Sequence, residues 1–253
     1  MKTEKFFTNL KSAILFITIL PAGKDVAYSP KGMIKFFPVV GLILGAGLLV
    51  FDMCISYLWS PAVVSVLDVL FLVVVTGAFH LDGLGDTADG LFSHRSKERV
   101  LEIMKDSRTG MMGLVAVFCV LAVKTAGIYS VKTSGTPFQT LTLLLIIPSY
   151  SRAAMLFGMK SLDYGRKETG TGLDFFEKAI GLKDFVFVLI PIALSLFLGY
   201  KGLVLNLVFI ILVVSILSFY KKKLNCITGD MLGAMNEITE AVLFLATGAV
   251  MAF

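Results

Sequence analysis

Residues 36–59 read FFPVVGLILGAGLLVFDMCISYLW, and Asp52 is the only charged residue among them. An α-helix rises 1.5 Å per residue, so a stretch of this length can cross the roughly 30 Å hydrocarbon core of a membrane. A segment in that core must satisfy its own backbone hydrogen bonds, which favours helices. This stretch therefore predicts a transmembrane helix.

Other stretches of the chain have the same character, and the composition agrees, since 57% of the residues are hydrophobic and 16% are charged. Six spans are expected at residues 36–59, 61–80, 111–131, 137–159, 185–200 and 202–220, and a short seventh at 238–253. We therefore predict an all-α, polytopic integral membrane helical bundle. It should have about six or seven transmembrane helices plus interfacial amphipathic helices, and residues 1–253 should form one domain.

The basic residues predict which side of the membrane each loop faces. Of the 23 Lys and Arg residues, 20 lie in or beside loops that the expected spans place on one side. The positive-inside rule makes that side cytoplasmic, so we expect insertion in the cytoplasmic (inner) membrane and contact with its lipids. The net charge of +5 is spread over these loops and needs no nucleic acid to explain it.

The first 35 residues are expected to form an N-terminal helix and a loop. Phe6, Phe7, Leu10, Ile14 and Ile17 recur at helical spacing, with lysines between them. This pattern favours an amphipathic helix that lies in the cytoplasmic membrane interface. A secretory signal is the alternative, because a cationic start precedes a short apolar run.

Residues 80–113 read HLDGLGDTADGLFSHRSKERVLEIMKDSRTGMMG and carry the strongest chemical signal. Asp82, Asp86 and Asp89 have the spacing i, i+4, i+7, which places them on one face of a helix. Carboxylates that converge repel one another, and all-oxygen ligands suit Mg²⁺, Mn²⁺ or Ca²⁺. The motif therefore predicts a divalent-metal site facing the cytoplasm, with a solvated turn as the alternative.

Several residues around these aspartates extend the predicted site. Gly83 and Gly90 are poor helix formers, so their presence suggests that something bulky, such as a phosphate, approaches the backbone. Residues 97–106 (KERVLEIMKD) should form a short amphipathic helix, with Asp106 at its end beside the cluster as a ligand or a base. His80 is either a proton carrier or an interface residue.

Four charged residues in or beside the expected spans form a second group, namely Asp68, Lys124, Glu237 and Glu240. Charges in such places are usually functional or paired, and both interpretations stay open for these four. Asp230 belongs to the same helical stretch as the two glutamates.

A carboxylate cluster in a membrane protein has two chemically distinct interpretations. In an enzyme, a divalent cation binds a diphosphate and a hydroxyl attacks phosphorus. In a divalent-cation transporter, carboxylates bind and release the ion as helices rock, usually near the bilayer midplane. The predicted position at a cytoplasmic helix end, among basic residues, favours the enzyme.

The motifs also resemble a known family. HLDGLGDTADG at 80–90 and RVLEIMKDSRTGMMG at 99–113 closely resemble the adenosylcobinamide-GDP ribazoletransferases, the cobalamin (5'-phosphate) synthases of bacteria and archaea. The resemblance extends to KGMIKFFPVVGLILG at 31–45, SRAAM at 151–155 and TGDMLGAMNEITEAV at 228–242. It therefore covers most of the chain, in the family's order.

The resemblance implies a Mg²⁺-dependent phosphotransferase that completes the nucleotide loop of cobalamin. Adenosylcobinamide-GDP and α-ribazole, or α-ribazole 5'-phosphate, would be joined to give adenosylcobalamin (5'-phosphate) and GMP. Membrane lipid, a homodimer and other corrinoid-assembly enzymes are the expected partners. The residues and the resemblance together assign Asp82, Asp86, Asp89 and Asp106 to metal, Asp82, Asp106 and Arg108 to catalysis, and Gly83, Gly90, Arg95, Lys105, Thr228 and Asp230 to substrate.

The family also resembles the CDP-alcohol phosphotransferases of phospholipid synthesis, whose motif is D-x-x-D-G-x-x-A-R. Asp86, Asp89 and Gly90 match that motif, but Ser93 and His94 stand in place of its Ala-Arg pair. A CDP-alcohol phosphotransferase is therefore the alternative enzyme.

Overall fold

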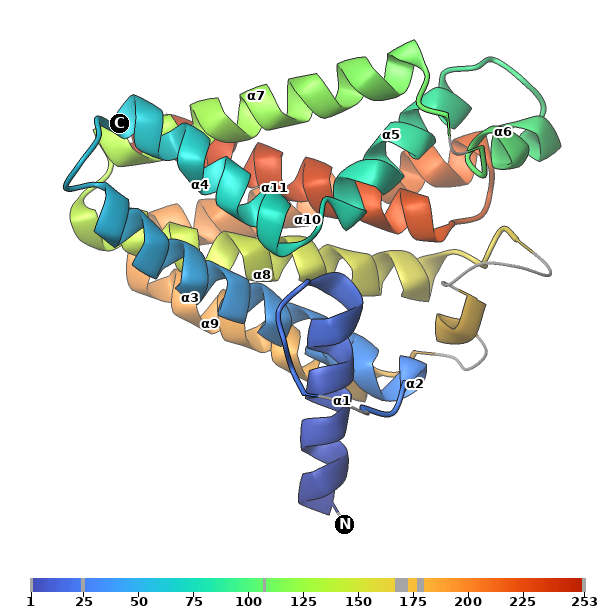
Figure 1. Cartoon of the computed structure of the whole chain (residues 1–253), viewed down its shortest axis with the longest axis horizontal. Helices are drawn as coiled ribbons and strands as arrows, with labels where there is room; N and C mark the ends of the chain where they lie inside the picture. The colour runs from blue at the N-terminus through green and yellow to red at the C-terminus, as the bar shows by residue number, and fades with distance from the viewer. Residues whose placement is uncertain (1, 24–25, 107, 167–172, 177–179, 252–253) are drawn as a thin grey trace.

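The long helices lie side by side along one direction (Figure 1). The computed structural model describes residues 2–23, 26–106, 108–166, 173–176 and 180–251. Its α-helices are α1 (Lys2–Ile17), α2 (Pro30–Met33), α3 (Phe37–Ile55), α4 (Pro61–Val75), α5 (Phe79–Leu91), α6 (Lys97–Ile103), α7 (Met111–Ser134), α8 (Pro137–Ser161), α9 (Leu189–Ser195), α10 (Tyr200–Lys223) and α11 (Gly229–Met251). Its 3-10 helices are η1 (Ile34–Phe36), η2 (Leu173–Phe175), η3 (Leu182–Val188) and η4 (Leu196–Leu198).

The prediction of an all-α polytopic membrane bundle is confirmed. Five helical stretches in the described ranges are long and apolar enough to cross a membrane, namely Pro30–Ile55, α7, α8, α10 and α11. A sixth crossing results if α4 and α5 are taken together. No β-strand occurs among the described residues, where one isolated bridge pairs Tyr164 with Ile227.

The expected span over residues 61–80 is not one straight helix. Gly77 and Ala78 have φ angles of +60° and +57°, so the chain leaves the right-handed helical region between α4 and α5. This conformation costs a residue with a Cβ, such as Ala78, about 1–2 kcal/mol. The axes of the two helices differ by 91°, and α5 therefore starts in a new direction.

Two other spans also differ from expectation. The stretch at 185–200 forms η3, α9 and η4, a series of short helical turns that is not among the candidate membrane crossings. In contrast, the doubtful last span is part of α11, which begins at Gly229 and is 23 residues long. The expected segment was short and carried Glu240 near its start, and this carboxylate is paired inside the bundle.

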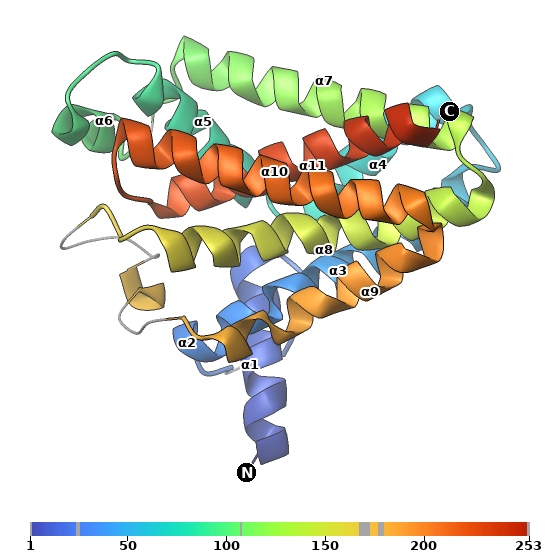
Figure 2. The ribbon, with the colours of Figure 1, turned by 180° about the vertical axis from the view of Figure 1, so that it is seen from behind.

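The polar loops gather at one end of the bundle. Figures 1 and 2 both place α6, the last turns of α8 and α10 and the first turn of α11 at the same end, which we call the α6 end. The turns that join α3 to α4 and α7 to α8 lie at the opposite end, with the last turn of α11. The α6 end is therefore the one that the distribution of Lys and Arg predicts to be cytoplasmic.

The predicted N-terminal helix is present as α1, which crosses the direction of the long helices (Figure 1). Ala13 and Ile17 are buried, whereas Phe6 and Phe7 are exposed. The Ile19 amide donates to the Val75 carbonyl over 2.8 Å and so ties this segment to the end of α4. An amphipathic helix in this orientation suits a membrane interface, and its location there stays a prediction.

Helices α3 and α8 pack through glycines. A Cβ on Gly41 would overlap the carbonyl oxygen of Pro148, and one on Gly45 would overlap that of Leu145. The two backbones therefore touch without intervening side chains, as expected for small residues between transmembrane helices. The Ser149 hydroxyl adds a hydrogen bond of 2.7 Å to the Pro38 carbonyl.

Buried charges join α7, α8 and α11 inside the bundle. The Lys124 ammonium contacts Glu237 at 2.6 Å and Glu240 at 2.8 Å. Arg152 also pairs with Glu240, which accepts a hydrogen bond of 2.9 Å from the Ser151 hydroxyl. Toward the other end, Lys132 of α7 contacts Asp52 and Asp68. Of the two interpretations left open by the sequence, pairing is the one that the structure shows.

The close contact between α3 and α8 can be tested by adding a side chain to it. We expect Gly45→Leu to destabilise the protein by about 1–3 kcal/mol, because the backbones must separate. Thermal unfolding of the purified protein in detergent measures this effect. Ala46→Leu is the matched control, since Ala46 is the next residue on α3 and is exposed. Equal losses in the two variants would contradict the packing argument.

Candidate active site

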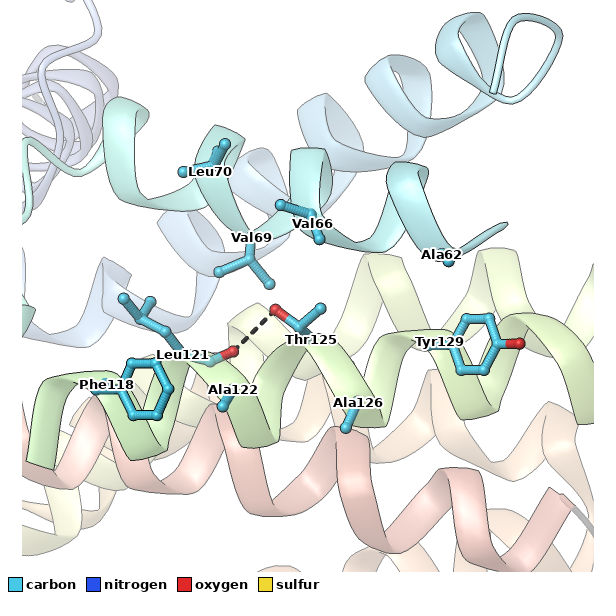
Figure 3. A pocket seen from close by; sticks show the side chains of 10 residues that line it. All are labelled: Ala62, Val66, Val69, Leu70, Phe118, Leu121, Ala122, Thr125, Ala126 and Tyr129. Atoms are coloured by element: carbon cyan, nitrogen blue, oxygen red, sulfur yellow. Dashed lines mark hydrogen bonds between the residues drawn. The ribbon is translucent and has the colours of Figure 1, made fainter. Parts of the chain in front are cut away.

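A cavity of about 640 Å³ on the outer surface of the bundle is not the site of chemistry. It lies between α4 and α7 and is lined by Ala62, Val66, Val69, Leu70, Phe118, Leu121, Ala122, Thr125, Ala126 and Tyr129 (Figure 3). None of these side chains carries a charge, and the Thr125 hydroxyl donates to the Leu121 carbonyl of its own helix over 2.9 Å. A surface of this kind suits lipid, so reactive groups must be sought at the α6 end.

The three motif aspartates share one face of α5, as predicted. Asp82 is exposed, and Asp86 and Asp89 are half-buried. The Asp86 carboxylate interacts electrostatically with Asp82, Asp89 and Asp230, so the structure brings Asp230 of α11 to the same place. Asp82 and Asp86 accept no hydrogen bond from the residues that the structure describes. These two carboxylates are therefore available to a ligand.

Arg166 is a residue of this site that the sequence analysis missed. Its guanidinium pairs with the Asp230 carboxylate and donates to the Met104 carbonyl over 3.2 Å. Only 11% of the Arg166 side chain is exposed. The available signal was weak, because Arg166 lies in a polar loop and is separated from Asp230 by 64 residues.

A short backbone connection positions Arg166. The Gly165 amide donates to the Ile227 carbonyl over 2.9 Å, and the Ile227 amide donates to the Asp163 carbonyl over 3.0 Å. These bonds hold the chain after α8 against the segment that leads into α11. The next residue, Thr228, is fully buried and accepts a hydrogen bond of 3.2 Å from the Met231 amide. Thr228 therefore caps the start of α11, whose first turn carries Asp230.

The two glycines predicted to admit substrate contact protein instead. A Cβ on Gly83 would lie 2.8 Å from the Asp230 carbonyl oxygen, because α5 packs directly on the start of α11. A Cβ on Gly90 would lie 2.7 Å from the Met104 side chain. In the structure these glycines therefore allow close packing around the aspartates.

Asp89 caps a neighbouring helix. Its two carboxylate oxygens accept hydrogen bonds from the Gly110 amide at 2.6 Å and from the Gly113 amide at 2.8 Å. These amides belong to the first turn of α7, where backbone N–H groups lack partners within the helix. A carboxylate there is also favoured by the helix dipole. Asp89 thus holds the start of α7 against α5.

The remaining predicted residues lie around this cluster. Asp106 pairs with Arg108, whose Nη2 lies 2.6 Å from Oδ2 of the aspartate, and this hydrogen bonding lowers the pKa of Asp106 to about 2. Asp106 is not among the groups that interact with Asp86. The predicted helix beside it is present as α6, and Arg95 and Lys105 are exposed near its two ends. His80 is buried, and neither ring nitrogen has a hydrogen-bond partner among the described residues.

The site offers oxygen ligands, but it is not a closed metal centre. Within the described ranges, no three His, Cys, Asp or Glu side chains are placed so that they could hold one ion together. Asp89, Asp106 and Asp230 each have a partner of their own. Asp82 and Asp86 remain, and their carboxylates suit a hard divalent cation.

Comparison with known proteins places this arrangement in context. The family model described as cobalamin-5-phosphate synthase matches residues 9–248. The adenosylcobinamide-GDP ribazoletransferase of Acetivibrio thermocellus is 34% identical over 248 residues, which are 95% of this chain and 97% of the relative. The protein of that name from Alkaliphilus metalliredigens is 37% identical, with coverage of 94% and 95%. No solved structure matches.

The capping role of Asp89 predicts a loss of stability. We expect Asp89→Ala to lower the free energy of unfolding by about 1–2 kcal/mol, because two amides at the start of α7 lose their acceptor. Thermal unfolding in detergent checks this. Asp106→Ala should change the unfolding temperature little, since the exposed Asp106 carboxylate bonds to Arg108 alone among the described residues. A stability unchanged by Asp89→Ala would rule out the cap.

Proposed function

This chain belongs to the cobalamin-5-phosphate synthase family and is a transferase with adenosylcobinamide-GDP ribazoletransferase activity, and we propose that the α5 aspartates serve this reaction through a divalent cation. The proposal rests on Asp82 and Asp86, two carboxylates that have no hydrogen-bond partner among the described residues and lie beside Asp230 and Arg166. The comparisons do not favour a CDP-alcohol phosphotransferase or a cation transporter.

The proposed reaction replaces a phosphoanhydride bond by a phosphoester bond. A ribose hydroxyl of α-ribazole, or of α-ribazole 5'-phosphate, attacks the phosphorus that bears the corrinoid. The bond from that phosphorus to the GMP oxygen breaks, and the hydroxyl loses its proton. The products are adenosylcobalamin, or its 5'-phosphate, and GMP.

Asp82 and Asp86 are the residues that would hold Mg²⁺. In phosphoryl-transfer sites this ion is commonly bound by one or two protein carboxylates, with substrate phosphates and water completing its six ligands. Two available carboxylates therefore fit, although no three acidic groups converge in the described part of the site. When bound, the ion would neutralise the negative charge that develops on the departing phosphate.

Other residues of the chain are assigned to phosphate contact, to proton transfer and to attraction of the substrate. Arg166 is held by Asp230, and its planar guanidinium suits contact with a phosphate. Of the two aspartates that the sequence offers as a base, we assign Asp82, because Arg108 holds the carboxylate of Asp106. The exposed Arg95, Lys105 and Arg108 would attract an anionic substrate to the α6 end.

The location of the site follows from the same features. The aspartates, Arg166 and the exposed cations all lie at the α6 end, where the basic loops gather. The positive-inside rule makes this the cytoplasmic end in an inner membrane. We therefore propose that adenosylcobinamide-GDP and α-ribazole enter from the cytoplasm.

The metal assignment is tested by Asp86→Asn. We expect turnover to fall at least about a hundredfold, because the cation loses a ligand and with it stabilisation of the transition state. GMP release from adenosylcobinamide-GDP by the purified protein, with Mg²⁺ present and then chelated, measures this. Glu102→Gln is the control, since Glu102 is an exposed carboxylate on α6.

Two results would contradict this assignment. One is near-normal GMP release by a folded Asp86→Asn variant. The other is wild-type turnover that continues undiminished after chelation. If the wild-type protein releases no GMP at all, the transferase activity itself is contradicted.

A further inference from the structure

A second cavity at the α6 end has the chemistry of a ligand site. Its volume is about 610 Å³, which lies within the range of small-molecule pockets. It is lined by Met159, Lys160, Ser161, Leu162, Asp163, Tyr164, Leu173, Phe176, Ile180, Lys221 and Asn225. These residues come from the end of α8, the segment around η2 and the end of α10. In contrast to the cavity between α4 and α7, this one is bordered by charged and polar side chains.

The cavity adjoins the aspartate site through the backbone connection described above. Asp163 and Tyr164 line the cavity, and Tyr164 forms the isolated bridge with Ile227. Two residues later, Arg166 contacts Asp230. A short stretch of chain, from Asp163 to Arg166, therefore connects the cavity to the proposed reaction centre.

The polar groups of the cavity include two that the described chain leaves available. The exposed Asp163 carboxylate accepts no hydrogen bond within the described ranges, and Lys221 forms no ion pair there. The Lys160 ammonium, in contrast, donates a hydrogen bond of 2.6 Å to the Ile180 carbonyl. A negative and a positive group are thus both free to meet a ligand.

Aromatic rings complete the lining. Tyr164 and Phe176 both border the cavity, and their ring centroids lie 5.0 Å apart with the planes tilted by 35°. Such rings provide a surface on which a planar base can stack. The lining therefore combines a stacking surface, a carboxylate and an ammonium.

We propose that this cavity binds the guanosine monophosphate part of the substrate, an inference that rests on the proposed function. The guanine edge presents N1–H and the 2-amino group, two donors that suit the Asp163 carboxylate. The phosphate suits Lys221, and the base stacks on Tyr164 and Phe176. The corrinoid is far larger than this cavity.

The other substrate matches the lining less well. The base of α-ribazole is a benzimidazole joined to ribose through one ring nitrogen, so it has no N–H donor. In this cavity its base would offer no donor to the Asp163 carboxylate, whereas guanine offers two. The cavity therefore discriminates in favour of the nucleotide that leaves.

Product inhibition tests the proposal with the full-length purified protein. We expect GMP to compete with adenosylcobinamide-GDP. It should bind at least about tenfold more tightly than AMP, because the guanine edge offers N1–H and the 2-amino group to the carboxylate and the adenine edge does not. IMP keeps N1–H but lacks the 2-amino group, so its inhibition constant should be intermediate. Equal constants for GMP, IMP and AMP would overturn the proposal.

Two variants separate the base contact from the phosphate contact. Asp163→Asn should raise the inhibition constant of GMP about tenfold and leave that of AMP unchanged. Lys221→Ala should raise the inhibition constants of GMP and AMP by the same factor. The matched controls are Glu102→Gln and Lys222→Ala, since neither residue lines the cavity.

The outcomes distinguish this inference from the proposed function. If Asp163→Asn turns over normally and keeps the wild-type preference for GMP, the cavity is not the guanosine site, and the transferase activity stands. If the wild-type protein produces no GMP, the proposed function fails. Equilibrium dialysis with radiolabelled GMP then tests the cavity by itself, and absence of binding would overturn it.

Discussion

The buried ion pairs of Lys124 and Arg152 with Glu237 and Glu240 are the constraint on which the arrangement of the bundle depends. The two positive and two negative charges of this cluster compensate one another in the buried interior of the bundle. Removal of one partner from such a cluster leaves a buried charge, at a typical cost of about 3–5 kcal/mol. Because the four residues lie on α7, α8 and α11, these helices can be assembled in one register only.

That register determines where the reactive end of the bundle lies. Once α7 and α11 are fixed side by side, their first turns meet at the α6 end, and α5 packs against both. Asp89 accepts amide hydrogen bonds from the start of α7, and Gly83 touches the backbone of Asp230 at the start of α11. The aspartate face is thus held by two helix beginnings instead of by a loop, which suits a site that must keep its geometry.

Much of this could be predicted from the sequence, because periodicity determines which residues share a helix face. Spacing alone placed Asp82, Asp86 and Asp89 together and predicted α6. It could not reveal which neighbouring backbone each side chain meets. The capping of α7 by Asp89 and the pairing of Arg166 with Asp230 join residues that are 21 to 64 positions apart. Likewise, the bend at Gly77 and Ala78 depends on how α5 packs, and an apolar run carries no sign of it.

The division of work among the acidic residues bears on how the proposed cation would bind. Asp89 holds a helix, Asp230 holds Arg166 through one carboxylate oxygen and Asp106 is held by Arg108, so Asp82 and Asp86 are the two carboxylates of the site that have no hydrogen-bond partner among the described residues. Two carboxylates would form an incomplete shell for Mg²⁺, which would take its other ligands from phosphate and water. Binding of the cation and of the diphosphate would then be coupled, since the diphosphate supplies oxygen ligands to the cation and the cation supplies positive charge to the diphosphate. The proposed site would then have a low affinity for the cation until the substrate binds.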